Sequence, residues 1–205
     1  DIFNRFQLAG YKFIQTWDGF VYHMTCRGSR FADGAKRNPN GEVFMKNRET
    51  DEWLKQNERS TRNFIRKWGH FVKHDEFMKP IIPHRYDIGF VIKNCTQKIL
   101  HDLEPWCSTM YIDCDFDEYI KKEQNNTIVS MKDRVKPYDN EKNNDIIVEF
   151  DGNVYQFNEI YFSLIQTLPD ILSDSGEVGD MLLDIFRISI NSLKVYEKEL
   201  IKCEH

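Results

Sequence analysis

The sequence lacks several features that would assign a protein class directly. It has no run of about 18 apolar residues, so it carries no candidate membrane-spanning helix. Its first residues lack the order of basic, apolar and small residues that marks a secretory signal peptide. No internal repeat or low-complexity tract occurs along the 205 residues. The chain begins with Asp1 inside an expected helix, so we expect a piece of a longer protein.

Cysteine is scarce and widely spaced. The five cysteines form no Cys-x-x-Cys pair, and their odd number argues against a disulfide framework. This usage favours a reducing compartment, and we expect a cytoplasmic protein.

The chain does contain enough apolar residues for a folded core, because 40% of it is apolar and 14% is aromatic. Its charge is divided unevenly. Residues 1–80 hold 15 Lys and Arg against 10 Asp and Glu, whereas residues 81–205 hold 13 against 23. The basic first part favours an anionic ligand, and a solvated basic surface is the alternative.

The apolar spacing predicts a mixed α/β fold. Helices are expected over residues 1–9, 50–68, 96–103, 116–122 and 159–172, and a long amphipathic helix over residues 177–202. Strands are expected over residues 11–15, 20–22, 87–92, 109–112 and 127–131, and a hairpin with an Asp-Gly turn over residues 146–157. The β-α-β order over residues 87–112 predicts a parallel pair with a right-handed crossover.

Two domains are expected from this order. Residues 25–41 form a long irregular segment, and residues 70–85, with Pro80 and Pro83, are interpreted as a linker. We therefore place a first domain at residues 1–79 and a small α/β domain, ending in two helices, at residues 80–205.

Several short motifs follow one another in the first 70 residues. They are Asp1-Ile2-x-x-Arg5, Ala9-Gly10-Tyr11-Lys12, Val21-Tyr22-His23, Arg27-Gly28-Ser29-Arg30 and Asn63-Phe64-Ile65-Arg66-Lys67-Trp68-Gly69. The ordered series resembles the C-terminal part of a family 2 glycosyltransferase of the GT-A fold. Residues after about 85 resemble no family.

The resemblance implies an inverting enzyme that transfers a sugar from a nucleotide-diphosphate sugar to a glycan or another hydroxyl acceptor. Asp1 matches the last acidic position of a Glu-Asp-x-Asp cluster and is therefore the candidate catalytic residue of this chain, although the base that deprotonates the acceptor would lie just upstream. The nucleotide-binding half and the Asp-x-Asp motif would also lie upstream. We therefore expect this chain to be inactive alone, with a divalent ion, Mn²⁺ or Mg²⁺, bound in the complete enzyme and none bound here.

The same resemblance gives roles to residues of the irregular segment. His23 would help to hold the metal or the diphosphate, and a structural histidine that hydrogen-bonds the loop is the alternative. Arg27, Ser29 and Arg30 surround Gly28 with donors suited to a leaving diphosphate. Solvated loop charges with a capping serine are the alternative for these three residues.

A second hypothesis places the function in residues 80–205, as a non-catalytic module that binds an acceptor or a protein or forms a homo-oligomer. It depends on an exposed apolar stripe along the helix expected over residues 177–202. Nucleotide binding there is weakened by Lys93-Asn94-Cys95, which lacks the glycines of a dinucleotide turn. Aromatic residues over 53–74 have helical core spacing, so we expect no nucleic-acid partner.

Overall fold

The structure of the protein is a computed structural model that describes residues 1–14, 16, 18–19, 29–30, 36–37, 51–156, 158–197 and 200. The chain divides into two compact units. The larger unit comprises Asp1–Lys12 with Thr61–His205, and the smaller unit comprises Phe13–Ser60. The division expected between residues 79 and 80 falls inside the larger unit and stays a prediction.

The smaller unit contains a short antiparallel pair and the start of a long helix. β1 (Ser29–Arg30) pairs with β2 (Lys36–Arg37), and α2 (Asp51–Trp68) begins in this unit and ends in the larger one. The predicted end of this helix is confirmed, because Gly69 has a φ of 76°, a conformation that glycine adopts without steric cost.

The larger unit is built on a six-stranded mixed sheet. Its order is β5 (Val135–Pro137), β4 (Thr109–Ile112), β3 (Ile88–Lys93), β6 (Ile146–Asp151), β8 (Phe186–Ile190) and β7 (Gly179–Leu183). The first four strands are parallel, and the last two run antiparallel to their neighbours. The predicted parallel β-α-β unit is confirmed, with α3 (Gln97–Leu103) as its helix.

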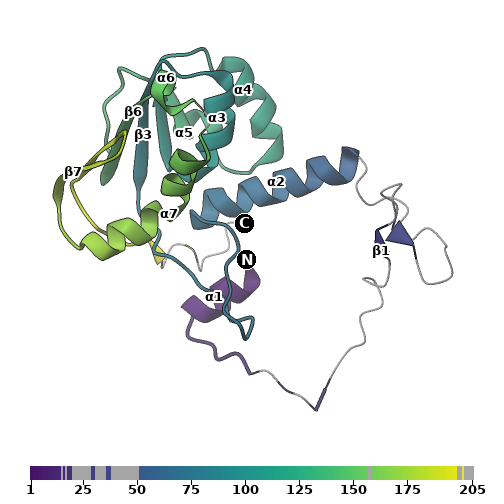
Figure 1. Cartoon of the computed structure of the whole chain (residues 1–205). Coiled ribbons are helices and arrows are strands. Elements are labelled where there is room, and N and C mark those ends of the chain that lie inside the picture. The colour runs from purple at the N-terminus through teal and green to yellow at the C-terminus, as the bar shows by residue number, and fades with distance from the viewer. Residues whose placement is uncertain are drawn as a thin grey trace. The chain divides into compact units, whose positions relative to one another are not determined.

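The other helices of the larger unit are α1 (Ile2–Leu8), α4 (Asp117–Glu123), α5 (Met131–Arg134), α6 (Gly152–Tyr155) and α7 (Glu159–Ser175), with 3₁₀ turns at Glu104–Trp106 and Gln124–Asn126. The helices expected at residues 1–9, 116–122 and 159–172 are therefore confirmed. Figure 1 shows α3, α4 and α5 gathered beside β3, and β7 at the outer edge of the sheet.

One face of the sheet forms the core, because alternate residues of each strand point to the same side. The buried residues on this face are Ile88, Phe90, Ile92, Met110, Ile112, Ile146, Val148, Phe150, Phe186, Ile188 and Ile190. Ile65 of α2, Leu100 of α3 and Leu168 of α7 belong to the same cluster. The mixed α/β fold class is thus shown.

The opposite face is crossed by the connection between β5 and β6. Asn144, in that connection, accepts a hydrogen bond from Tyr111 Oη at 3.0 Å and donates to Thr109 Oγ1 at 3.3 Å. Tyr111 and Gly89 alternate with core residues of their strands, so Asn144 lies on the non-core side. The chain moves from β3 to β5 on one face and returns to β6 over the other, which keeps each parallel crossover right-handed.

Several of the predicted strands do not form. No strand forms over residues 127–131, where the chain instead leads into α5 and then β5. No hairpin forms after β6, because the Asp151 side chain accepts the Asn153 N–H and starts α6. Residues 11–14 form no strand, whereas residue 15 and the strand expected at 20–22 lie outside the described residues.

The long helix expected over residues 177–202 is wrong over residues 179–190, which form the hairpin β7–β8, with Asp184 at a φ of 53° in a two-residue turn. Glu197 and Leu200 are helical, and the expectation that the chain ends in two helices stays a prediction. The apolar residues fit both periods: Met181, Ile185 and Ile188 have helical spacing, but Phe186, Ile188 and Ile190 alternate and are buried against the sheet. The burial of these three side chains against the sheet favours strands over a helix here.

Candidate functional site at Asp1

The structure describes only some of the residues predicted for the site. His23 and Arg27 lie outside the described residues. Ser29 and Arg30 form β1, and their side chains are not described. Asp1 is described, directly before α1. Within the described part of the chain, no group of three or more His, Cys, Asp or Glu side chains could hold a metal ion.

Asp1 is held by the end of α2. Its Oδ1 lies 2.8 Å from Lys67 Nζ and accepts a hydrogen bond from the indole Nε1 of Trp68 at 3.1 Å. Its Oδ2 lies 3.7 Å from a guanidinium nitrogen of Arg5, one turn along α1. Trp68 is buried, whereas the Asp1 side chain is 46% exposed. One rigid and one flexible donor therefore fix the carboxylate.

The helix geometry favours this contact on both sides. Lys67 lies in the last turn of α2, where the partial negative charge of the helix end attracts cations. Asp1 precedes the first turn of α1, where the partial positive charge attracts an anion, although its side chain makes no capping hydrogen bond. A carboxylate already accepting from two donors is suited to positioning α1 rather than to removing a proton.

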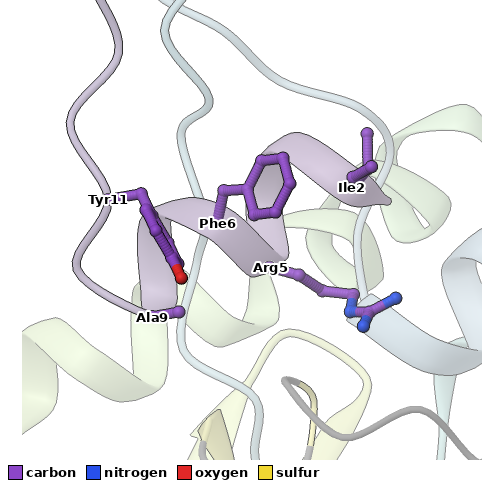
Figure 2. Close-up of a pocket in the computed structure, with 5 residues that line it drawn as sticks. All are labelled: Ile2, Arg5, Phe6, Ala9 and Tyr11. Carbon is purple, nitrogen blue, oxygen red and sulfur yellow. The ribbon is translucent and has the colours of Figure 1, made fainter.

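A surface pocket of about 320 Å³ lies beside this contact on α1 (Figure 2). It is lined by Ile2, Arg5, Phe6, Ala9 and Tyr11. The rings of Phe6 and Tyr11 meet edge to face with centroids 5.4 Å apart. Two aromatic rings and one guanidinium suit a ligand that combines a flat apolar face with an anionic group.

The orientation of α1 is unusual for a surface helix. Asn4 is its one buried residue, whereas Ile2, Phe3 and Phe6 are exposed. A helix that packs on its own domain normally buries its apolar stripe. The apolar side chains of α1 are therefore largely exposed, and Ile2 and Phe6 line the pocket.

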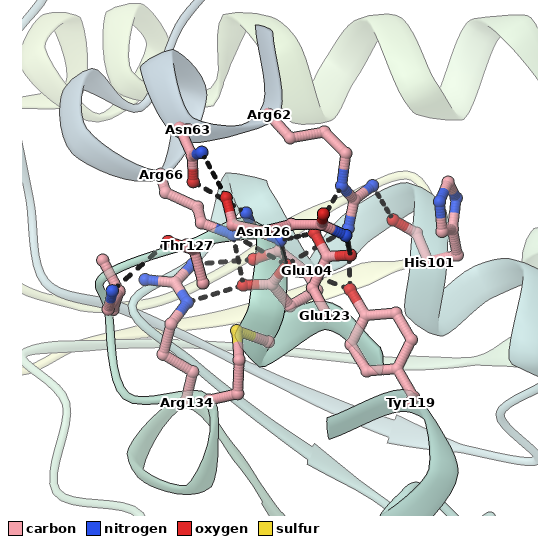
Figure 3. A network of polar contacts seen from close by, with 12 residues as sticks. Arg62, Asn63, Arg66, His101, Glu104, Tyr119, Glu123, Asn126, Thr127 and Arg134 are labelled. Carbon is pink, nitrogen blue, oxygen red and sulfur yellow. Dashed lines mark hydrogen bonds and ion pairs between the residues drawn. The ribbon is translucent and has the colours of Figure 1, made fainter. Parts of the chain in front are cut away.

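Further along α2, a buried network of charged side chains attaches the helix to neighbouring helices and turns of the larger unit (Figure 3). Glu104 lies at its centre and is fully buried. Its carboxylate accepts from Arg66 NH2 at 2.6 Å, from Arg134 Nε at 2.6 Å and from Tyr119 Oη at 3.1 Å. Arg62 NH2 adds a fourth donor at 3.3 Å.

A second carboxylate completes the network. Glu123 accepts from Arg62 Nε at 3.0 Å and from Arg66 NH2. Arg62 NH1 also donates to the His101 carbonyl at 2.6 Å, and Asn63 Nδ2 donates to the Asn126 carbonyl at 2.8 Å. The last turns of α2 are thereby fixed to α3, α4 and the 3₁₀ turn after α4.

The network stays ionised at neutral pH. Burial would raise the pKa of Glu104, but the positive charges and hydrogen bonds of Arg134 and Arg66 outweigh it and lower the pKa to about 2. The pKa of Glu123 is lowered too: burial alone would raise it, but Arg66 and Arg62 of α2 outweigh this effect. Three guanidinium groups face two carboxylates, so every acid is matched. The cluster therefore supports the structure and offers no carboxyl group for proton transfer near pH 7.

This network was missed from the sequence. The helix was interpreted through its aromatic stripe, yet Arg62 and Arg66 are four residues apart and share one helix face. Both are less than 10% exposed. The spacing of the two arginines was the available signal, but their acidic partners lie about 40 and 60 residues away and cannot be paired from sequence.

The carboxyl ends of the parallel strands, where ligands of α/β folds commonly bind, are closed by internal hydrogen bonds. Asp113, after β4, accepts the main-chain N–H of Asn94 at 2.7 Å and of Cys95 at 2.9 Å. The Asn94 side chain donates to Asp151 at 3.0 Å. These groups satisfy one another and hold the loops after β3, β4 and β6.

Comparison of the chain with protein-family models, with curated proteins and with solved structures finds no match. Over the described residues, no helix has the length and apolar character needed to cross a membrane.

Proposed function

We propose that residues 1–79 contribute part of a GT-A-type, family 2 glycosyltransferase, which moves a sugar from a nucleotide-diphosphate sugar to a hydroxyl acceptor. One observation carries the proposal. Two of the motifs that resemble this family are separated by more than 50 residues, and they meet at one carboxylate, since Asp1 binds both Lys67 and Trp68. Such a contact is what a shared site requires.

Asp1 acts as a positioning residue in this proposal. The resemblance puts the catalytic base just before Asp1, so the ion pair with Lys67 and the hydrogen bond from Trp68 would fix the chain next to that base. Holding a base within hydrogen-bonding reach of the acceptor hydroxyl lowers the barrier for direct displacement of the diphosphate.

The pocket on α1 supports a sugar ligand in the same region. Phe6 and Tyr11 present ring surfaces that can stack on the apolar face of a sugar ring, and Arg5 can donate to its oxygens. His23, Arg27, Ser29 and Arg30 keep their proposed places around the diphosphate.

The resemblance also implies a divalent metal, Mn²⁺ or Mg²⁺, near His23. The described residues provide no cluster of ligands that fits such an ion. No step is therefore assigned to it, and the ion remains a proposal for the parent enzyme.

The test uses the gene product that contains this chain and measures release of nucleoside diphosphate from nucleotide sugars in the presence of an acceptor and Mn²⁺. Lys67→Met should lower turnover about tenfold, because small displacements near a base are costly. Lys73→Met is the matched control, since Lys73 pairs with Asp170 at 3.2 Å with similar exposure and away from Asp1. Equal turnover in both variants, or no diphosphate release by the wild type, contradicts the proposal.

A non-catalytic binding or oligomerisation role for residues 80–205 is the second candidate. The helix that was expected to carry its apolar stripe does not form, and Ile188 is buried in β8. The exposed edge strand β7 favours this role instead.

A further inference from the structure

The two edges of the sheet differ in how well they are protected. β5 has three residues and includes Pro137, which has no N–H to offer to another strand. β7 has five residues and contains no proline, lysine or arginine. Edge strands of natural proteins usually carry such residues, because they prevent pairing with another chain. β7 is therefore the edge that is open to pairing.

The hydrogen-bond pattern of β6, β8 and β7 shows which main-chain groups of β7 face outward. Asn191 N donates to Asp145 O at 2.8 Å, just beyond the paired ends of β8 and β6. Main-chain groups at odd positions of β8 therefore point to β6, and those at even positions point to β7. Because Met181 pairs with Ile188, the groups of Met181 are used within the sheet. Those of Asp180 and Leu182 point outward.

The side chains at these two positions lie on the non-core face. Leu182 is 76% exposed. The Asp180 carboxylate, the charge that could repel a second strand, accepts a hydrogen bond from Ser189 Oγ at 2.6 Å. Val178, directly before the strand, is 67% exposed. Among the described residues, the edge thus combines apolar side chains with main-chain groups that have no partner in the sheet.

We propose that β7 pairs antiparallel with β7 of a second copy of this chain, about a twofold axis at Met181. In this register Asp180 of each copy lies opposite Leu182 of the other. Both residues direct their main-chain groups outward, so the pair exchanges hydrogen bonds twice, once on each side of the axis. The two six-stranded sheets then continue into one another.

Self-pairing in this register is complementary in charge and shape. No two Asp180 side chains face each other. Arg187 pairs with Leu182 across β8 and β7, so it lies on the same face as Asp180 of the second copy, two strands away. The two Leu182 side chains are diagonal neighbours across the axis, within reach of each other. An unrelated extended peptide would gain the hydrogen bonds but not these symmetric contacts.

The joined edge is short, so the association should be weak. Stable complexes usually bury about 1,200–2,000 Å², and a pair of five-residue strands buries less. We expect a dissociation constant of about 10–500 μM, observable as a monomer–dimer equilibrium that depends on concentration. The inference does not depend on the glycosyltransferase proposal.

The experiment is sedimentation equilibrium of the full chain from about 1 μM to 1 mM, together with hydrogen exchange at both ends of this range. The wild type should shift from monomer to dimer, with the amides of Asp180 and Leu182 becoming protected only at high concentration. Leu182→Glu should weaken dimerisation about tenfold or more, because each introduced carboxylate would lie directly opposite Asp180 of the other copy and the two carboxylates would repel. Ile128→Glu is the matched control, because Ile128 is 86% exposed and lies far along the chain from β7.

Leu182→Pro gives a second reading, because it removes an outward N–H and leaves the bonds between β7 and β8 in place. If it unfolds the hairpin, Leu182→Glu decides the question. A monomer at every concentration, or a dimer unaffected by Leu182→Glu, overturns the proposal. Protection of the two amides that appears only when a different protein is added assigns the edge to that protein, and overturns self-pairing as well.

Discussion

Arg66 donates to the carboxylate of Glu104 through both Nε and NH2, and the two side chains are 1% and 0% exposed. This contact joins α2 to the turn after α3, across 38 residues of sequence. An ion pair in this position has lost its water, so each charge depends on the other.

Removing one side of this network should therefore be costly. Glu104→Gln should lower the free energy of unfolding by about 3–5 kcal/mol, because it leaves buried guanidinium groups without their countercharge. Urea unfolding followed by circular dichroism measures the loss. Glu118→Gln, in the exposed first turn of α4, is the control and should change stability by less than about 0.5 kcal/mol. A similar small effect of both changes would show that the network contributes little.

The same carboxylate predicts a dependence on pH. Its pKa falls from an ordinary value of 4.5 to about 2 in the folded protein. A depressed pKa contributes stability above the unfolded value, and this contribution is lost as the pH falls from about 5 through 2. Between pH 6 and pH 2, wild-type stability should fall by about 3 kcal/mol more than that of Glu104→Gln. Parallel curves for the two proteins would contradict the assignment.

Gly89 and Asn144 are predicted to depend on each other. A β-carbon at Gly89 would overlap Asn144 Oδ1 and lie 2.9 Å from Asn144 Cγ. Gly89→Ala should therefore destabilise the protein by about 2–4 kcal/mol, through overpacking and loss of the hydrogen bond from Tyr111. In the Asn144→Gly background the same change should cost much less. Additive losses in this double-mutant cycle would argue against the contact.

Two glycines that end helices form a matched pair for the next prediction. Gly69 and Gly10 have φ values of 76° and 82°, so an alanine is strained at either position. A β-carbon at Gly69 would also lie 3.2 Å from Arg85 NH1, whereas none of the atoms around Gly10 lies within 4 Å. Gly69→Ala should cost about 1 kcal/mol more than Gly10→Ala in thermal unfolding. Equal costs would mean that Arg85 moves aside freely.

The helices and strands that the sequence predicted correctly are those determined by residues close to one another in the chain. The apolar run before Lys93 and the Thr96 cap gave β3 and α3, because Thr96 Oγ1 accepts the Ile99 N–H at 3.2 Å as a capping residue does. Gly69 and Gly176 end their helices in the left-handed conformation, which glycine adopts without steric cost. These features depend on residues within one or two turns.

The elements that failed depend on distant residues. Asp151-Gly152 is typical of a hairpin turn, but β6 lies between β3 and β8, and Gly152 is needed because a β-carbon there would overlap the Asn94 carbonyl. The segment at residues 179–190 became strands because β6 offered an open edge for Ile188. At the candidate site, Asp1 was singled out from a motif, whereas its contact with Trp68 required the folded chain. The predictions for His23, Arg27, Ser29 and Arg30 stay predictions.

The central place of β3 has a consequence for how the protein is made. Its neighbour β4 follows after one helix, but its other neighbour, β6, begins about 50 residues later. At about 5–20 residues per second, a ribosome needs about 3–10 s to synthesise that interval. During this time the β3 edge that will bind β6 is open, because its hydrogen-bonding partner has not yet been made. The nascent chain thus passes through a stage in which a strand that is central in the folded sheet is an edge strand, open to pairing with other chains.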